Sequence, residues 1–487
     1  MDVVNQQRAP FVEALEAYCQ LHMVPFHTPG HKLGHQSSAY QKMLFGEALI
    51  RDLGVMYALD DLFQPKGALR EAMDLAADLY GAGHTFFSVN GTTACVEAML
   101  LAVCQAGDEI ILSREAHKSV FHGILLSRTI PVYVSSQFAE KEQVSLGPTL
   151  EDIKATVDSH PHAKALMLTY PTYDGIAIDL PSIIQYAHKK GLYVLVDEAH
   201  GAHLPFHPDL PPEALACGAD CVAQSTHKLA GSLTQTSMLH CRQGFPYVER
   251  MARAMEIVQS TSPHYWFLAS LDSARQQLAV EGKVLLAKTM ELARYAREEL
   301  NKLPGIYVWG REVERYTGVI GVDETKIVID FADLGLMGVQ AEKELRKQGI
   351  EVELVAGTHV LVLITIGDDM ESIQALIKAC QIISSNHKVH KVQAVKELPL
   401  PQPEVVITPG EAWNKTLEQI PFAQANQRIA GETILFYPPG IPVVAIGERI
   451  TSLCIAYIQK KMNEGYVPHG ASDHTLKTIL VVKDGKE

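Results

Sequence analysis

The chain has 487 residues, which is too long for one simple core and predicts two or three domains. Its formal net charge is −14, and no cluster of Lys and Arg stands out, so neither nucleic acid nor an anionic membrane is expected as a partner. The N-terminus shows no signal-peptide pattern, no apolar run reaches the ~18 residues of a spanning helix, and the 8 cysteines have no dense spacing, so we expect a cytoplasmic protein with free thiols.

The first 50 residues are predicted to form an N-terminal arm, with a helix near 11–21 followed by an irregular stretch rich in Pro, Gly and His. From about residue 80, short apolar runs alternate with helical patterns. This alternation predicts an α/β fold with a mostly parallel seven-stranded sheet that is covered by helices on both faces. The predicted strands are residues 85–89, 109–112, 131–135, 165–169, 193–196, 220–223 and 237–240.

The pattern changes after a long predicted helix at 271–303. Strand-like runs at 326–331, 351–354 and 360–365 indicate a smaller α+β domain, and a Pro-rich stretch at 398–403 is typical of a linker. The predicted organisation is an arm (1–50), a large domain (51–305), a small domain (306–395) and a C-terminal domain (396–487).

Two polar groups follow two of the predicted strands. Asp197 ends an apolar run, and Lys228 stands in Ser-Thr-His-Lys directly after another run, 31 residues later. Each alone is more commonly a solvated strand end or an exposed lysine. Since ligands of α/β sheets bind beyond the carboxyl ends of the strands, the two side chains are expected to converge on one ligand.

Two further segments supply complementary groups. Gly91, Thr92 and Thr93 stand between a strand and a helix, where free N–H groups and hydroxyls suit a phosphate, although a simple helix cap is the commoner outcome. His117 follows another strand and can stack on a flat ring. A phosphate cup, a stacking ring, an acid for a ring nitrogen and a lysine for an aldehyde together predict pyridoxal 5'-phosphate (PLP), with Lys228 as the tethering residue.

These residues lie in motifs that resemble the prokaryotic ornithine/lysine/arginine decarboxylases, and most closely the short Bacillus-type arginine decarboxylases. The resemblance extends over nearly the whole chain in the family's order. Its motifs are Phe-His-Thr-Pro-Gly-His-Lys at 26–32, Asn-Gly-Thr-Thr at 90–93, His-Lys-Ser at 117–119, Asp-Glu-Ala-His-Gly-Ala-His at 197–203, Ser-Thr-His-Lys at 225–228, Ser-Thr-Ser-Pro at 260–263, Tyr-Pro-Pro-Gly-Ile-Pro at 437–442 and Gly-Glu at 447–448. It implies the aspartate-aminotransferase-like fold of PLP-dependent transferases.

The resemblance also implies a role for each matching residue. Lys228 forms the Schiff base, Asp197 pairs with the pyridine nitrogen, and Ala199 and His117 cover the two ring faces. His200 lies near the ring hydroxyl. The phosphate is held by hydroxyl and imidazole groups of Thr92, Thr93, Ser225 and His227.

Assembly and substrate follow from the same resemblance. Ser260 and Thr261 are expected to reach the active site of a partner subunit, and because the chain begins at the linker region without a wing domain, a homodimer or dimer-based tetramer is expected. The expected reaction converts L-arginine to agmatine and carbon dioxide in polyamine biosynthesis, with lysine or ornithine as alternative substrates. Candidate contacts to the substrate are Glu448 and His27; for its distal cation Asp60, Asp61 and Glu353 are also candidates.

Three other interpretations remain open at this point. Another fold type I activity, an aminotransferase or lyase, shares Lys228 and Asp197. A zinc site from His200, His203 and His207 is disfavoured because Pro205 and Pro208 interrupt the helix that would align the imidazoles, and we expect no metal there or at Cys217 and Cys221. A binding protein without activity is disfavoured because every expected chemical group is present.

Overall fold

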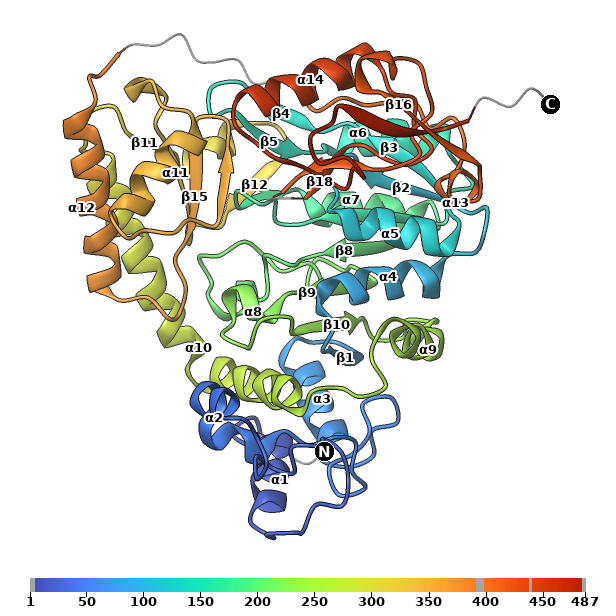
Figure 1. Cartoon of the computed structure of the whole chain (residues 1–487), viewed down its shortest axis with the longest axis vertical. Coiled ribbons are helices and arrows are strands. Elements are labelled where there is room, and N and C mark those ends of the chain that lie inside the picture. The colour runs from blue at the N-terminus through green and yellow to red at the C-terminus, as the bar shows by residue number, and fades with distance from the viewer. Residues whose placement is uncertain (1–4, 391–397, 438–439, 484–487) are drawn as a thin grey trace. The chain divides into compact units, whose positions relative to one another are not determined.

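Seven strands form the central sheet, in the order β1-β10-β9-β8-β6-β2-β3 (Figure 1). The computed structural model describes residues 5–390, 398–437 and 440–483. β2 runs parallel to β3 and β6, and β8 runs parallel to β9, whereas β10 is antiparallel to both of its neighbours. Each strand lies within about a residue of its prediction: β1 His84–Ser88, β2 Glu109–Ser113, β3 Ile130–Val134, β6 Ala165–Thr169, β8 Tyr193–Asp197, β9 Cys221–Gln224 and β10 Ser237–Cys241.

The chain divides into two compact units, and the first comprises residues 1–103, 195–208 and 212–286. Its core gathers fully buried side chains from α1, α3 and the start of α10, among them Phe11, Leu69 and Leu268. Its helices are α1 Pro10–Cys19, α2 Ala39–Phe45, η1 Gly46–Arg51, α3 Ala68–Leu79, α4 Gly91–Val103, η2 Leu204–Phe206, α8 Thr226–Leu229, α9 Val248–Val258 and the first part of α10, Tyr265–Leu300.

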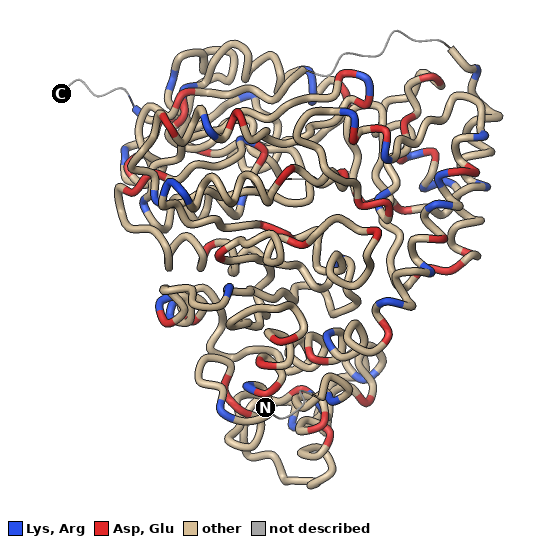
Figure 2. The backbone as a smooth tube through the Cα atoms, turned by 180° about the vertical axis from the view of Figure 1, so that it is seen from behind, with Lys and Arg blue, Asp and Glu red and all other residues tan. Residues whose placement is uncertain are grey.

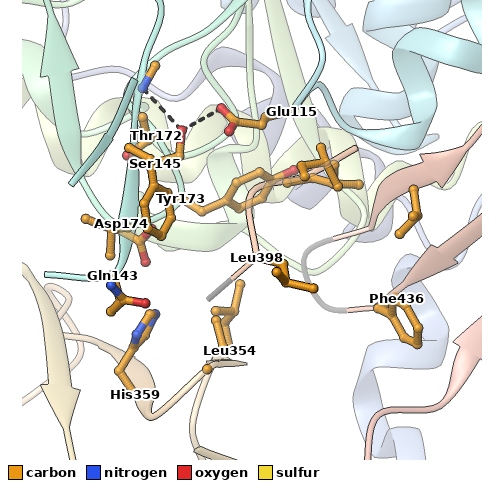
Figure 3. Close-up of a pocket in the computed structure, with 18 of the residues that line it drawn as sticks. Glu115, Gln143, Ser145, Thr172, Tyr173, Asp174, Leu354, His359, Leu398 and Phe436 are labelled. Carbon is orange, nitrogen blue, oxygen red and sulfur yellow. Dashed lines mark hydrogen bonds between the residues drawn. The ribbon is translucent and has the colours of Figure 1, made fainter. Parts of the chain in front are cut away.

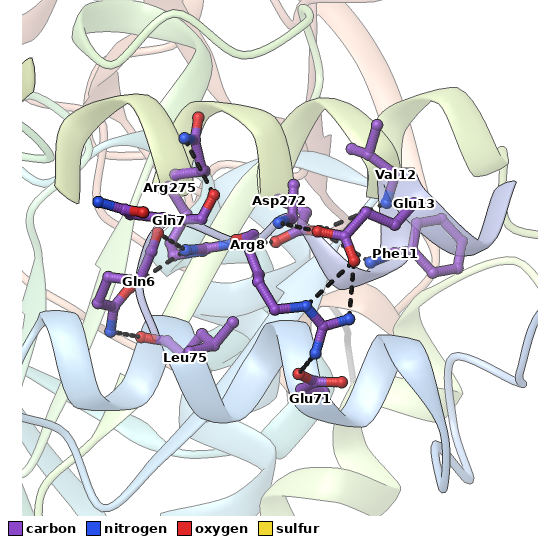
Figure 4. Close-up of polar contacts among 12 residues, drawn as sticks. Gln6, Gln7, Arg8, Phe11, Val12, Glu13, Glu71, Leu75, Asp272 and Arg275 are labelled. Carbon is purple, nitrogen blue, oxygen red and sulfur yellow. Dashed lines mark hydrogen bonds and ion pairs between the residues drawn. The ribbon is translucent and has the colours of Figure 1, made fainter. Parts of the chain in front are cut away.

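The N-terminal arm is attached to the first unit through buried charges on α10 (Figure 4). The carboxylate of Asp272 accepts the backbone N–H of Phe11 at 2.9 Å, where the orphan donors of helix α1 point, and it also accepts a hydrogen bond from Arg275 at 2.6 Å. Arg275 donates to the carbonyl of Gln6 at 2.9 Å. Because both charged side chains are fully buried and paired, the arm is part of the core rather than a loose extension.

The second unit comprises residues 104–194, 209–211 and 287–487. β7 and β12 pair as a separate antiparallel ribbon, and β4 and β5 form a hairpin. The elements of its first part are β4 Gln137–Ala139, β5 Val144–Gly147, β7 Ile176–Ile178, α5 Lys118–Ser127, α6 Leu150–Ser159 and α7 Leu180–Lys189.

The expected small α+β arrangement is present in this unit as an antiparallel sheet of order β11-β13-β15-β14, covered by α11 and α12 (Figure 1). One predicted strand is displaced: β14 begins at Leu354, where the sequence predicts an end. The pairing of β14 with β15 is confined to the residues beside the turn at Gly357, which has a φ of +52°. The elements are β11 Tyr307–Val308, η3 Arg311–Arg315, β12 Val319–Val322, β13 Lys326–Asp330, η4 Ala332–Leu334, α11 Gly338–Lys347, β14 Leu354–Ala356, β15 His359–Leu363 and α12 Met370–Asn386.

The C-terminal segment has its own apolar core, to which Ile434, Val444 and Ile458 contribute. Its elements are α13 Pro409–Trp413, β16 Leu417–Pro421, η5 Phe422–Gln424, β17 Ile434–Phe436, β18 Ile441–Val444, α14 Ser452–Asn463, β19 Pro468–His469 and β20 Thr478–Val482. The predicted boundary at 395/396 and the motif residues Pro438 and Pro439 lie outside the described residues. The four-part domain division stays a prediction.

Acidic and basic residues are interspersed over the backbone, and no basic stripe stands out in this view of the described residues (Figure 2). None of the helices within the described ranges has the length and apolar character that a bilayer crossing requires.

Candidate active site

Lys228 lies one turn beyond the carboxyl end of β9, on the short helix α8. Its Nζ atom is 2.9 Å from Nε2 of His200, which follows β8 in the loop 198–203. β8 and β9 are parallel neighbours, with Asp197 opposite Ala223 in their register. The sheet pairing therefore brings together two loops that are separated along the chain, as the sequence predicts for Asp197 and Lys228.

Asp197 is the last residue of β8, and its side chain is buried. Its Oδ1 accepts the backbone N–H of Ala199 at 3.1 Å. Burial raises the pKa of Asp197, while the positive charge of Lys228 and the Ala199 N–H act in the opposite direction and favour the carboxylate. An acid held beside a cationic amine in this way can balance a positive charge on a bound ring.

Hydroxyl groups gather at the N-terminus of α4. Thr92 Oγ1 shares a hydrogen bond with Ser225 Oγ and lies 2.8 Å from Ser237 Oγ. Gly91 opens the helix with a φ of +75°, a conformation that favours glycine. Thr92 is buried and Thr93 is exposed. The two threonines, which are predicted to share the same phosphate-binding role, therefore have different surroundings. Free N–H groups and buried hydroxyls at one helix end form an anion-binding donor set.

His227 stands between this donor set and Lys228 along the chain. Its Nδ1 donates to the carbonyl oxygen of Thr236 at 2.9 Å, so the neutral ring carries its proton on Nδ1. Burial lowers the pKa of His227, and the neighbouring Lys228 charge lowers it further. Nε2 can donate to an anion only when the ring is protonated, and a bound phosphate would favour that form.

Behind the strand ends lies a buried polar network that sequence reasoning missed. The carboxylate of Glu198 accepts hydrogen bonds from Gln224 Nε2 and from the backbone N–H of Ala214, both at 2.7 Å. Gln224 Oε1 lies 3.2 Å from His240 Nε2, and His240 Nδ1 lies 2.8 Å from Thr85 Oγ1. Burial lowers the pKa of His240 to about 3, so its ring stays neutral. The sequence signals for this network are Gln224 at the end of β9 and His240 within β10, because each is a polar residue in a mostly apolar strand.

Within the second unit, His117 is the N-cap residue of α5. Its Nδ1 accepts the backbone N–H of Ser119 at 3.2 Å, and the hydroxyl of Ser119 is 2.8 Å away. The backbone of Gly440 lies against the other edge of the ring, since a Cβ added there would be 3.2 Å from Nε2. The carbonyl of Gly440 also accepts the N–H of Lys118 at 3.0 Å. His117 is thus held in one orientation by its own helix and by the C-terminal segment.

Glu448, a candidate for binding the substrate's distal cation, already forms hydrogen bonds with other groups of the protein. Its carboxylate accepts hydrogen bonds from Arg114 at 3.1 Å, Tyr133 at 2.6 Å and the backbone N–H of Ala445 at 2.6 Å. Glu448 and Arg114 are both about 1% exposed. These contacts support a structural role for Glu448 rather than the expected contact to substrate.

The other predicted residues have weaker support from their surroundings. His27 is half-buried and its Nδ1 contacts the carbonyl of Thr28, while Ser260 and Thr261 are exposed. Asp60 accepts the backbone N–H groups of Lys66 and Gly67, which makes it a loop-capping residue.

The histidines and cysteines considered as metal ligands were also located. No group of three or more His, Cys, Asp or Glu side chains with the geometry of a metal site occurs in the part of the chain that the structure describes. Cys221 instead faces Cys241 across the β9–β10 pair, with the sulfur atoms 3.5 Å apart.

Comparisons with known proteins identify the family and the fold. A family model described as "Orn/Lys/Arg decarboxylase, major domain" matches residues 9–317, and its C-terminal domain matches residues 392–465. The chain is 40% identical to an arginine decarboxylase of Bacillus subtilis and 39% identical to one of Bacillus anthracis, over 99% of this chain and 99% of each relative. A crystal structure of the Francisella novicida lysine decarboxylase is similar with a TM-score of 0.84 and 22% identity, covering 98% of this chain and 81% of that one. The predicted PLP-dependent transferase fold is confirmed.

Proposed function

Because this chain belongs to the Orn/Lys/Arg decarboxylase family, we propose that it decarboxylates L-arginine to agmatine with PLP as its cofactor. The preference for arginine rests on four curated relatives named arginine decarboxylase, which are 37–40% identical to the chain. Relatives named lysine decarboxylase are only 24–26% identical. Lysine and ornithine remain the alternative substrates.

The single observation that carries the proposal is the cluster of Asp197, His200 and Lys228 at the ends of two parallel strands. The residues present fit PLP. The hydroxyls of Thr92, at the start of α4, and of Ser225, at the start of α8, provide hydrogen-bonding groups for a phosphate, and Lys228 provides the amine that binds an aldehyde. When bound, the cofactor acts as an electron sink for the electron pair that carbon dioxide leaves at the substrate Cα.

Asp197 would hold a proton on the cofactor's ring nitrogen. A carboxylate beside that nitrogen raises its pKa, because the anion stabilises the protonated form. The backbone N–H of Ala199, at 3.1 Å from Oδ1, fixes the carboxylate's orientation. Ala199 and His117 would then cover the two faces of the ring, as the family resemblance implies.

Lys228 and His200 would handle protons at the substrate. Their nitrogen atoms are 2.9 Å apart, so one carries the proton and the other accepts the hydrogen bond. We propose that Lys228 delivers the proton that replaces the lost carboxylate at Cα, and that His200 stabilises the protonated amine of Lys228 until then.

We also propose a homodimer, or a tetramer built from such dimers, with Ser260 and Thr261 contributing to the partner's site. The support is a concentration of exposed large apolar side chains in the N-terminal arm, among them Phe26 at 95%, Tyr40 at 76% and Met43 at 71% exposure. Apolar surface of this kind is typical of protein interfaces. The free cysteines support the expected cytoplasmic location, where thiols stay reduced.

The test offers arginine, lysine and ornithine in competition and identifies the products by mass spectrometry, together with carbon dioxide release. We expect agmatine to predominate, and Lys228→Ala and Asp197→Asn each to abolish or strongly reduce turnover. Lys189→Ala, which changes an exposed lysine, is the matched control. Lys228→Ala should also lose the visible absorbance that PLP shows when tethered to lysine.

Two outcomes would contradict the proposal. Retained turnover in Lys228→Ala would remove the central role of this residue. Stoichiometric keto-acid formation, instead of carbon dioxide release, would identify an aminotransferase.

A further inference from the structure

A cavity of about 230 Å³ within the second unit contains chemical groups that the proposed reaction has not used (Figure 3). Its wall includes Glu115 beyond β2, Asp174 beyond β6 and His359 on β15. A water molecule takes about 30 Å³ in the liquid, so this space suits a small organic molecule rather than a single water or bare ion.

The two carboxylates of the cavity have unequal hydrogen bonding. Glu115 Oε2 accepts the hydroxyl of Ser145 at 2.6 Å. Asp174 Oδ1 is buried and has no hydrogen-bond partner among the described residues. Burial raises the pKa of both carboxyl groups, and the charge of Asp174 raises that of Glu115 further, while His359 and Lys326 act in the opposite direction on Asp174. A bound cation would relieve both penalties.

His359 is an independent sign of a missing ligand. Its side chain is 3% exposed and lines the cavity, and no hydrogen bond joins its imidazole to another described residue, although its charge lowers the pKa of the neighbouring Asp174 carboxyl. A buried polar group without a partner normally costs about 1–3 kcal/mol, so such groups are expected to meet a ligand or water.

The basic groups near the cavity are already engaged by acceptors. Lys326 donates to the carbonyl oxygens of Thr172 at 3.2 Å and Tyr173 at 2.8 Å. Lys461 lies 3.6 Å from the carboxylate of Glu464 and 4.9 Å from the ring centroid of Tyr466. Since the acceptors rather than the donors are under-used, the cavity suits a cation with several N–H groups, not an anion.

We propose that this cavity binds the guanidinium group of arginine or agmatine between the carboxylates of Glu115 and Asp174. A planar guanidinium presents up to five N–H donors, enough to satisfy both carboxylates and the His359 ring. The side chains of Tyr173, Leu354 and Phe436 line the same space and provide an apolar surface for the aliphatic stem (Figure 3). The choice of guanidinium rests on the proposed function, whereas the preference for a cation rests on the cavity alone.

The test measures agmatine binding to the holoenzyme by titration calorimetry, because agmatine is not turned over in the proposed reaction. We expect Asp174→Asn and Glu115→Gln each to weaken agmatine binding by about 30-fold, as removal of one partner of a buried ion pair does. Glu371→Gln, which removes an exposed carboxylate from α12 in the same unit, should bind agmatine as the wild type does. Cadaverine, which has an ammonium group in place of guanidinium, should bind more weakly.

Thermal unfolding without ligand separates binding from a structural role. Because Asp174 repels Glu115, Glu115→Gln should not lower the unfolding temperature. Asp174→Asn also removes the attraction of Asp174 to His359 and Lys326, so this variant is expected to unfold at a lower temperature. If one variant does unfold, the other still tests the cavity, since the amide of Glu115→Gln retains an oxygen for the Ser145 hydroxyl.

Comparing KM for arginine with agmatine binding also shows whether the cavity holds the guanidinium of the substrate or that of free agmatine. A parallel rise in KM for arginine identifies the substrate's own distal end, whereas an unchanged KM with weakened agmatine binding identifies a second site for the free molecule. Unchanged agmatine affinity in both variants would overturn the inference. Failure of the wild type to decarboxylate arginine would instead reject the proposed function and leave the binding result standing.

Discussion

The amine of Lys228 and the imidazole of His200 form a 2.9 Å nitrogen–nitrogen contact, although 28 residues separate them along the chain. A contact this short requires one donor and one acceptor. When Lys228 is an ammonium group, Nε2 of His200 must be unprotonated. The protonation states of the two residues are therefore coupled, and this coupling can be tested.

Replacing His200 should impair the proton-handling of Lys228. We expect His200→Ala to lower kcat by about 10- to 100-fold, which corresponds to the loss of a hydrogen bond to a charged group worth about 1.5–3 kcal/mol. His200→Gln should recover part of this rate, because its amide oxygen can accept a hydrogen bond. Steady-state rates across pH check this, with His162→Asn as an exposed control. Equal losses in both His200 variants, without a change in the pH profile, would indicate a purely structural role.

The contact of Gly440 with His117 predicts a difference between two glycine substitutions. Gly440→Ala should strain the backbone at φ +87° by about 1–2 kcal/mol and also press a methyl group against the His117 ring. Gly335→Ala has a φ of +69° and open space around the new methyl group, so it carries similar backbone strain alone. Urea unfolding should show a loss of stability for both variants, larger for Gly440→Ala because of the added contacts with Tyr437 and His117, and only Gly440→Ala should lose turnover. Full activity in Gly440→Ala would show that the orientation of His117 does not matter.

Removing the charge of Glu448 should destabilise the protein rather than weaken substrate binding. Glu448→Gln leaves the buried guanidinium of Arg114 without its counter-charge, and breaking such a pair costs about 3–5 kcal/mol. Asp74→Asn, in an exposed pair with Arg70, should cost under about 1 kcal/mol. Urea midpoints measure stability, and KM for arginine measures substrate binding. A large rise in KM at unchanged stability would restore Glu448 as a substrate residue.

The buried carboxyl of Glu213 should make stability depend on pH. Burial raises the pKa of Glu213 from 4.5 to about 7, so the folded state binds a proton more tightly than the unfolded state does. The contribution of Glu213 to the free energy of unfolding is fully present below about pH 4.5. It is lost as the pH rises through about 7, and the loss reaches up to about 3 kcal/mol. Glu213→Gln should remove this loss.

Urea unfolding of the wild type and of Glu213→Gln between about pH 5 and pH 8 measures the effect. The difference in stability in favour of the variant should grow with pH. A constant difference across this range would show that the carboxyl does not titrate there.

Much of this protein follows from local sequence pattern. Continuous apolar runs predict the seven strands because a strand buried on both faces needs no polar alternation. The ends of two apolar runs place Asp197 and Lys228 at or just beyond the ends of two strands. The motifs around these residues predict the family, which the comparisons confirm. The assignments of individual residues to cofactor and substrate stay predictions, and β14 shows that a hairpin turn can move a strand away from its apolar run.

Contacts between distant segments were decided only by the tertiary structure. The Glu198–Gln224–His240 network depends on β8, β9 and β10 being neighbours, and the Arg114–Glu448 pair joins residues 334 positions apart. No local pattern determines which strand lies beside which, because that order follows from packing of the whole sheet. The sequence therefore determined the strands and the family, and it predicted which groups carry the chemistry, whereas the partners of these groups, and the cavity around Asp174, depended on how distant segments pack together.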